Sequence, residues 1–223
     1  MSRTSESVEE AATRPDRILR HHLIDRLLHW LIATCMFALL ATGLLPIFGI
    51  KFDWVEPHWI VGLVLTAAVL VHVIRACTTL LLRSMWIGVD EVIASVVNEC
   101  STVSGKYAEP VKIGKYSVAQ KMFHLAMSCV VLLAIGTGII MMTGIDTPFG
   151  ERDPYFVSEG TRGLVFVIHG FATLVSITMI ILHVYFAIRP EKLYFMRSMI
   201  RGWITRAEYE ENHDPDLWDT DDS

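Results

Sequence analysis

The sequence predicts an all-α integral membrane protein in which residues 25–205 form a bundle of four transmembrane helices. Of its 223 residues, 52% are hydrophobic, and the mean hydropathy is +0.44. This composition is too apolar for an ordinary soluble domain of this length. Four long stretches, nearly free of charge, are each long enough to cross a bilayer as a helix. Basic residues gather in only some of the segments between and beyond them.

A polar, charged leader, residues 1–24, precedes the first apolar stretch and has no cleavable signal-peptide pattern. The first membrane helix is predicted at about 27–48. Its entry reads LIDRLLHW, which places His29 about one turn inside. The polar leader therefore stays outside the membrane, and the helix that follows stays within it.

The second helix is predicted at about 58–82. Pro57 marks its first turn, where the missing proline N–H costs nothing. The helix begins with His58 and carries His72 fourteen residues later. Both imidazoles thus belong to an otherwise apolar segment.

The connection at 83–121 contains WIGVDEVIASVV, which we interpret as a helix lying on the membrane surface. A helix packed on a soluble partner is compatible with the same pattern. Apolar residues at helical spacing support either interpretation: Trp86, Val89, Val92, Ile93 and Val96.

The third helix is predicted at about 122–143, and the fourth at about 163–188. The third opens with His124 and contains Gly136–Thr137–Gly138, which would allow close helix contact. After the fourth helix comes a basic amphipathic segment, and then residues 206–223, whose acidic composition predicts a disordered tail.

Charge distribution predicts the orientation of the bundle. Nearly all Lys and Arg residues lie in the leader, in the 83–121 connection and at 189–206. Because cytoplasmic segments carry the excess of basic residues, both termini are expected in the cytoplasm.

The fourth helix carries two histidines, His169 and His183, in the run VFVIHGFATLVSITMIILHVYFAIR. Fourteen residues at about 1.5 Å each place them roughly 21 Å apart on nearly the same face. A histidine in an apolar helix is often only a packed core residue. Polar side chains inside a membrane are costly, however, and usually functional. The pair therefore predicts two metal centres, and haem is the expected group because imidazole is a common axial ligand of its iron.

The four cysteines form neither CxxC nor CxxCH, which argues against covalent c-type haem and against iron–sulfur ligation by this chain. They are Cys35, Cys77, Cys100 and Cys129. We interpret most of them as small core residues.

The topology assigns a depth to each histidine. His58 and His169 are expected near the outer face, on parallel helices, and form the only credible outer pair. His183 needs a partner near the inner face, and spacing leaves three competitors open. These competitors are His29, His72 and His124.

The combination of LIDRLLHW, the proline–histidine start of the second helix, GKYSVAQK and the two histidines of the fourth helix resembles a known family. It is similar to the cytochrome b (gamma) subunit of membrane-bound respiratory formate dehydrogenases over about residues 20–205. Similar subunits serve thiosulfate reductases and some hydrogenases. The resemblance implies His58 and His169 as ligands of the outer haem b iron. It implies His29 and His183 for the inner one, in preference to His72.

The segment GKYSVAQK, residues 114–121, lies at the entry to the third helix and close in depth to His183. Polar groups beside an apolar slot suit a quinone, and an interfacial helix cap is the alternative. The resemblance places a quinone pocket here, with contacts expected from Ser117, Ala119, Gln120 and His183. Serine and alanine stand at 117 and 119, where the family typically has asparagine and glycine.

The function implied is electron transfer by a membrane anchor with two haem b groups and no catalytic residue of its own. Electrons would pass from an outer-face iron–sulfur subunit, paired with a molybdenum or tungsten catalytic subunit, to menaquinone or ubiquinone near the cytoplasmic face. The partners would dock around residues 49–57 and 144–162, and no nucleic acid is expected among them. The setting is a bacterial or archaeal cytoplasmic membrane. Alternatives are a quinol-oxidising cytochrome feeding a reductase or linked to a hydrogenase, and a haem-free anchor or proton-relay transporter.

Overall fold

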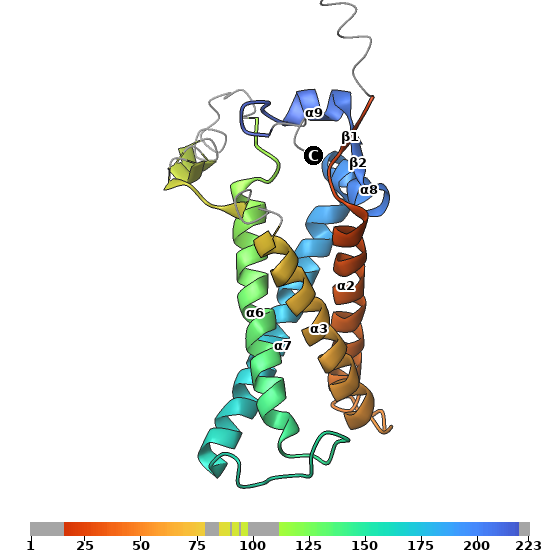
Figure 1. Cartoon of the computed structure of the whole chain (residues 1–223), viewed down its shortest axis with the longest axis vertical. Helices are drawn as coiled ribbons and strands as arrows, with labels where there is room; N and C mark the ends of the chain where they lie inside the picture. Colours follow the sequence, from red (N-terminus) through yellow and green to blue (C-terminus); the bar gives the residue numbers. More distant parts are fainter. Residues whose placement is uncertain (1–15, 79–84, 90, 94, 98–111, 219–223) are drawn as a thin grey trace, which may run out of the picture. The chain divides into compact units, whose positions relative to one another are not determined.

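The computed structural model describes residues 16–78, 85–89, 91–93, 95–97 and 112–218. Its long helices are α2 (Leu23–Leu44), α3 (Val55–Thr78), α6 (Val118–Met142) and α7 (Glu159–Ile188). Within the described residues, these four are long and apolar enough to cross a membrane. Helices α2 and α6 run in one direction and α3 and α7 in the other (Figure 1). The predicted bundle of four transmembrane helices is confirmed, in a mostly helical protein.

Each long helix begins three or four residues before its predicted start, because its first turn is not purely apolar. Asp25, Glu56 and Glu159 occupy first turns, where a carboxylate interacts favourably with the positive end of the helix dipole. Helix α2 ends at Leu44 instead of about 48, because Pro46 disfavours helical geometry in the residue before it. The predicted end of α3 at 82 lies outside the described residues.

The chain divides into two compact units, each assembled from segments that are distant in sequence. The helical unit comprises Leu27–Ile87 and Val118–Phe186. The terminal unit comprises Met1–Arg26, Gly88–Ser117 and Ala187–Ser223.

The interior of the helical unit is small relative to its apolar surface. Cys35 of α2, Leu65 of α3 and Val131 of α6 form its buried core cluster. Only 11–17% of each spanning window is buried inside the protein. So much exposed apolar surface is unfavourable in water but suits contact with lipid. The helices are therefore stabilised as a unit by the membrane as well as by each other.

The terminal unit is built on a two-stranded antiparallel sheet. β1 (Arg17–Leu19) pairs with β2 (Trp203–Thr205), with Ile18 opposite Ile204. A 3₁₀ turn, η1 (Pro190–Lys192), leads into α8 (Leu193–Arg201). Gly202 ends α8 at φ 93°, and a Cβ there would meet the His21 carbonyl oxygen at 3.0 Å. Glycine therefore suits this position for both its backbone angle and its space.

The acidic C-terminal segment is ordered as far as the structure describes it, which differs from the disordered tail predicted at 206–223. Helix α9 (Arg206–Asn212) starts with a capping box between Thr205 and Glu208. Tyr209 and Trp218 are buried, and the Tyr209 hydroxyl donates to the Trp218 carbonyl oxygen at 2.5 Å. The aromatic residues bury enough apolar surface to order a segment whose charges alone suggest disorder. Residues 219–223 lie outside the description.

Arg20 and His213 form a buried polar contact inside the terminal unit. Arg20 is 2% exposed and His213 is fully buried. The Arg20 guanidinium donates from Nη1 to His213 Nε2 at 3.1 Å and from Nη2 to the Lys115 carbonyl oxygen at 2.5 Å. His213 Nδ1 donates to the Gly114 carbonyl oxygen at 2.9 Å. Burial lowers the pKa of Arg20 to about 10, and burial followed by the Arg20 charge lowers the pKa of His213.

The helix predicted in the 83–121 connection is only partly described. Residues 91–93 and 95–97 are helical, and Trp86, Val89 and Ile93 are exposed. The GKYSVAQK segment is described throughout, whereas residues 98–111 lie outside the description. The placement of this helix on the membrane surface stays a prediction.

Candidate functional site: paired histidines in the helical unit

The predicted outer pair meets in the structure. His58, in the first turns of α3, and His169, on α7, have ring centroids 6.3 Å apart and ring planes at 70°. The His58 backbone N–H donates to the Trp54 carbonyl oxygen at 3.0 Å, which places His58 at the α3 entry. The two rings therefore face each other from parallel helices, as their spacing predicts.

A Thr–Gly pair lies against each ring of the outer pair. Thr42 Oγ1 of α2 is 2.8 Å from His58 Nδ1, and Thr137 Oγ1 of α6 is 2.9 Å from His169 Nδ1. The next residue is glycine in both cases. A Cβ at Gly43 would stand 3.6 Å from His58 Cε1, and one at Gly138 would stand 3.5 Å from His169 Cε1. Even a Cβ at either glycine would make only ordinary van der Waals contact with the ring, so neither imidazole is crowded on that side.

Neither Thr42 nor Thr137 was identified from the sequence, where residues 136–138 were interpreted only as a place for close helix contact. The signal that could have found them is the repeated pair: Thr42–Gly43 in the first long helix and Thr137–Gly138 in the third. The structure puts the second glycine of that segment against the His169 ring, while nothing lies within 4 Å of a Cβ built at Gly136.

The inner pair is formed by His29 of α2 and His183 of α7. Their ring centroids are 6.1 Å apart, with ring planes at 54°. Phe123 of α6 stacks on the His183 ring, with its centroid 5.4 Å away and its plane tilted by only 19°. Sequence reasoning did not identify Phe123.

The two other competitors for His183 meet each other instead. The rings of His72, on α3, and His124, on α6, have centroids 5.9 Å apart. The sequence left His72 open as an inner partner, because it comes fourteen residues after His58, just as His183 comes fourteen residues after His169. The geometry favours His29 for that place.

The spacing of the pairs fits two imidazoles on opposite sides of one metal ion. A metal–imidazole bond of about 2.0–2.1 Å, the zinc value, plus about 1.1 Å from nitrogen to ring centroid, gives a centroid separation of about 6.2–6.4 Å. The observed 6.3 Å and 6.1 Å lie within about 0.1 Å of this range.

The number of ligands distinguishes haem from a bare metal ion. Among the residues that the structure describes, no group of three or more His, Cys, Asp or Glu side chains could hold a metal. A bare ion needs three or four protein ligands, whereas the porphyrin supplies four and leaves two axial positions to the protein. Two facing imidazoles therefore fit haem iron better than they fit an isolated cation.

The two pairs lie at different levels of the same bundle. His169 and His183 belong to one uninterrupted helix, so their fourteen-residue separation corresponds to roughly 21 Å along its axis. His58 and His169 come near the connections that join α2 to α3 and α6 to α7. The other pair lies toward the opposite ends of these helices.

The residues predicted for a quinone lie around the start of α6. Ser117 immediately precedes the helix, and Ala119 and Gln120 belong to its first turn. Phe123, one turn after Ala119, stacks on the ring of His183. His183 is exposed on the surface of the helical unit. The α6 entry and the inner pair are therefore close within the helical unit.

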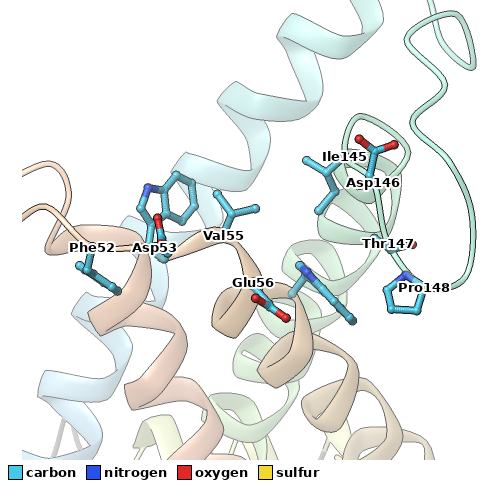
Figure 2. A pocket seen from close by; sticks show the side chains of 10 residues that line it. Phe52, Asp53, Val55, Glu56, Ile145, Asp146, Thr147 and Pro148 are labelled. Carbon is cyan, nitrogen blue, oxygen red and sulfur yellow. The ribbon is translucent and has the colours of Figure 1, made fainter.

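A cavity of about 490 Å³ opens at the end of the helical unit nearest the outer pair. Figure 2 shows residues 52–56 on one side of it and residues 145–148 on the other. Its lining combines aromatic rings with the carboxylates Asp53, Glu56 and Asp146. Trp54 also lines it, and its ring contacts that of His58 at 6.0 Å. One aromatic side chain thus adjoins both the cavity and the outer pair.

Curated proteins are similar to this chain over most of its length. The formate dehydrogenase cytochrome b556(fdo) subunit of Escherichia coli (strain K12) is 24% identical over 215 residues, which cover 90% of this chain and 92% of that one. The nitrate-inducible formate dehydrogenase cytochrome b556(Fdn) subunit of the same organism is 22% identical over 209 residues, covering 88% of each chain. The formate dehydrogenase cytochrome b556 subunit of Haemophilus influenzae is 22% identical over 220 residues, covering 89% of this chain and 81% of that one.

A family model described as prokaryotic cytochrome b561 matches residues 20–202. The match includes all four long helices and both histidine pairs. The chain therefore belongs to the prokaryotic cytochrome b561 family and is a bacterial membrane cytochrome b, a haem b-binding electron-transfer subunit.

Proposed function

We propose that this chain is the di-haem b subunit of a formate dehydrogenase-type complex and carries electrons across the membrane from an outer-face iron–sulfur subunit to quinone. The observation that carries the proposal is the pair of facing histidines at each of two levels, each with a spacing that suits one iron. Haem b bound at each pair would supply a one-electron carrier. The similarity to formate dehydrogenase cytochrome b556 subunits supports the choice of complex.

The chain's own residues hold and space these carriers. His58 and His169 are the proposed axial ligands at the outer level, and His29 and His183 at the inner level. Because one continuous helix carries a ligand of each level, their separation is set by its rigid rise of about 1.5 Å per residue. The surrounding apolar helices exclude water, which leaves electron transfer without competing chemistry.

The outer cavity supports the proposed docking of the iron–sulfur and molybdenum or tungsten subunits around 49–57 and 144–162. Its lining comes from these two connections and from the start of α3, and it combines tryptophans with carboxylates. Such a surface suits basic side chains of a partner, through ion pairing and cation–π contact. Trp54 connects this surface to His58.

We place the quinone, menaquinone or ubiquinone, beside the start of α6, with Ala119, Gln120 and His183 as contacts and Ser117 directly before the helix. The stacking of Phe123 on His183 supports this placement, because quinone rings bind in apolar slots with a few polar groups. The distribution of basic residues favours cytoplasmic termini, so protons for quinone reduction would come from the cytoplasm.

The test is purification of the native complex from membranes, with identification of the co-purifying subunits and a pyridine haemochrome assay of haem per chain. We expect two haem b groups and an iron–sulfur subunit. A colourless chain, or one haem per chain, would contradict the di-haem assignment, and a preparation without any iron–sulfur partner would contradict the proposed complex. Haem potentials measured against that of the quinone distinguish quinone reduction from quinol oxidation.

A further inference from the structure

The outer histidine pair has hydrogen-bond partners that the metal-binding role does not itself require. Thr42 reaches His58 from α2, and Thr137 reaches His169 from α6. In both contacts the ring atom is Nδ1. The hydroxyl proton and the ring proton cannot both be donated within one contact, so the donor must be identified first.

The hydroxyl proton of each threonine is already used within its own helix. Thr42 Oγ1 donates to the Ala38 carbonyl oxygen at 2.8 Å, and Thr137 Oγ1 donates to the Leu133 carbonyl oxygen at 2.7 Å. A hydroxyl has one proton to donate and two lone pairs to accept with. Each Oγ1 therefore accepts from the histidine, whose Nδ1 carries the proton.

This hydrogen bond fixes the tautomer of both rings. With the proton on Nδ1, the lone pair of a neutral imidazole is on Nε2, which is then the atom available to a metal. The bond also limits rotation of the ring about its Cβ–Cγ bond. In metal sites, a partner of this kind raises the basicity of the ligand as well as orienting it.

The arrangement occurs twice with the same local sequence. In each case a threonine and the glycine after it lie on one helix and contact a histidine on the next helix along the chain: α2 on α3, and α6 on α7. At the inner pair, the described residues place no such acceptor on His29 or His183. The two levels of the bundle therefore differ in how strongly their imidazoles are polarised.

We propose that Thr42 and Thr137 are positioning residues of the outer haem site, which hold His58 and His169 as Nδ1–H tautomers and lower the reduction potential of the outer haem. The inference rests on the proposed function, because it takes these histidines as iron ligands. A more basic imidazole donates more electron density and stabilises ferric over ferrous iron. Loss of the acceptor should accordingly raise the potential.

The experiment compares Thr42→Val and Thr137→Val with Thr42→Ser and Thr137→Ser in the purified complex. Valine keeps the shape but removes the hydroxyl acceptor, whereas serine keeps it. At His169 a backbone hydrogen bond to Ala134 remains in the valine variant, so Thr42→Val is the sharper of the two tests. Thr66→Val is the matched control. Thr66 makes the same type of hydrogen bond to a carbonyl of its own helix, to Gly62 at 2.8 Å, and has no hydrogen bond to a histidine among the described residues. The readouts are haem content, the midpoint potential of each haem, and the low-spin ferric signal in electron paramagnetic resonance.

Removing such a partner typically costs about 10- to 100-fold in metal affinity or activity. A tenfold loss confined to the ferric state corresponds to about 59 mV for a one-electron couple. We therefore expect each valine variant to raise the outer potential by up to about this amount. The serine variants and Thr66→Val should keep the wild-type potentials, and the inner haem should not change in any of them.

Unchanged outer potential and unchanged ferric signal in both valine variants would overturn the inference. If valine abolishes haem binding while serine preserves it at the native potential, the positioning role is supported. If serine fails as valine does, packing and not the hydrogen bond is responsible, and the inference is wrong. Failure of the proposed function looks different: wild type would then lack haem, or His58→Ala would keep both haems.

Discussion

Two histidines, one in each unit of this chain, are both held through Nδ1, but by different sets of partners. His169, in the helical unit, has its Nδ1 2.9 Å from Thr137 Oγ1, a contact in which we propose that the ring is the donor. His213, in the terminal unit, donates from Nδ1 to the Gly114 carbonyl oxygen and accepts at Nε2 from Arg20. A ring with one nitrogen open can bind a metal, whereas a ring with both nitrogens satisfied serves the fold.

The two rings also differ in how deeply they are buried and in what lies beside them. His213 is fully buried and lies edge-on against the Trp218 ring, with centroids 4.7 Å apart. His169 is only partly buried and faces another histidine beside a glycine. The fully buried histidine is the structural one, and the partly buried one, which faces a second imidazole, is the proposed ligand.

The largest expected effect separates these two histidines by haem content. His169→Ala should remove the outer haem and leave the inner one, because the remaining axial imidazole cannot hold the iron in the same six-coordinate state. His213→Ala should leave two haems per chain, because neither of its ring nitrogens is available to iron. Pyridine haemochrome per polypeptide measures both variants.

His58→Ala is the companion variant and should give the same single-haem product as His169→Ala. Two bis-histidine haems in both variants would show that the outer pairing is wrong. A loss of haem in His213→Ala without loss of the protein itself would contradict the structural role of His213.

A second comparison concerns the inner level, where His29 and His72 were competing partners for His183. His29→Ala should remove the inner haem, because its ring faces that of His183 at 6.1 Å. His72→Ala should keep both haems, because its ring contacts His124 instead. Haem content and reduced absorption spectra of the two variants measure the difference, and the reverse result would make His72 the ligand.

Spacing along the chain leaves one candidate for the outer pair but three for the partner of His183, and the reason is geometric. His58 and His169 each open the outer half of parallel helices, so few arrangements keep them apart. At the inner level, three helices present a histidine at similar depth, and which of them faces His183 depends on how the helices cross. That crossing depends on packing among residues such as Cys35, Leu65 and Val131, which a linear pattern does not encode.

The four membrane helices were predictable because lipid requires a length and an apolar composition that stand out in any sequence. The threonine contacts were not, because threonines in membrane helices commonly bond to a carbonyl of their own helix, and Thr42 looks like Thr66 until its neighbours are known. The helix after residue 205 was not predicted, because the many acidic residues of this segment dominate its composition. The two aromatic side chains that it buries, Tyr209 and Trp218, contribute little to that composition.

The third effect should appear in the terminal unit when Arg20 is replaced. Arg20→Met removes the donors to His213 Nε2 and to the Lys115 carbonyl oxygen. An acceptor left buried and unpaired costs about 1–3 kcal/mol, so local opening should become at least about fivefold more frequent. Hydrogen exchange of residues 112–117 and 206–218 in the purified complex measures this, with haem content unchanged.

Arg17→Met is the matched control for that variant. Arg17 lies over the Trp203 ring at 4.2 Å but is exposed, so its loss should change exchange little. Equal effects of Arg17→Met and Arg20→Met would contradict the importance of the buried contact.

The smallest expected effect is a pH dependence of the terminal unit that the helical unit need not share. Burial, with the Arg20 charge as a second cause, lowers the pKa of His213 in the folded state. Below about pH 6.5, the value of an unperturbed histidine, the opened state therefore binds a proton that the folded state does not. Stability must then rise with pH in this window and be complete above it. Lowering the pH from 7.5 to 5.5 should therefore increase the opening of residues 206–218. Hydrogen exchange corrected for its intrinsic pH dependence measures this, and His213→Asn should flatten the profile because it cannot titrate. If the variant keeps the wild-type slope, another group titrates, and the neutral, doubly bonded His213 is not what links this unit to pH.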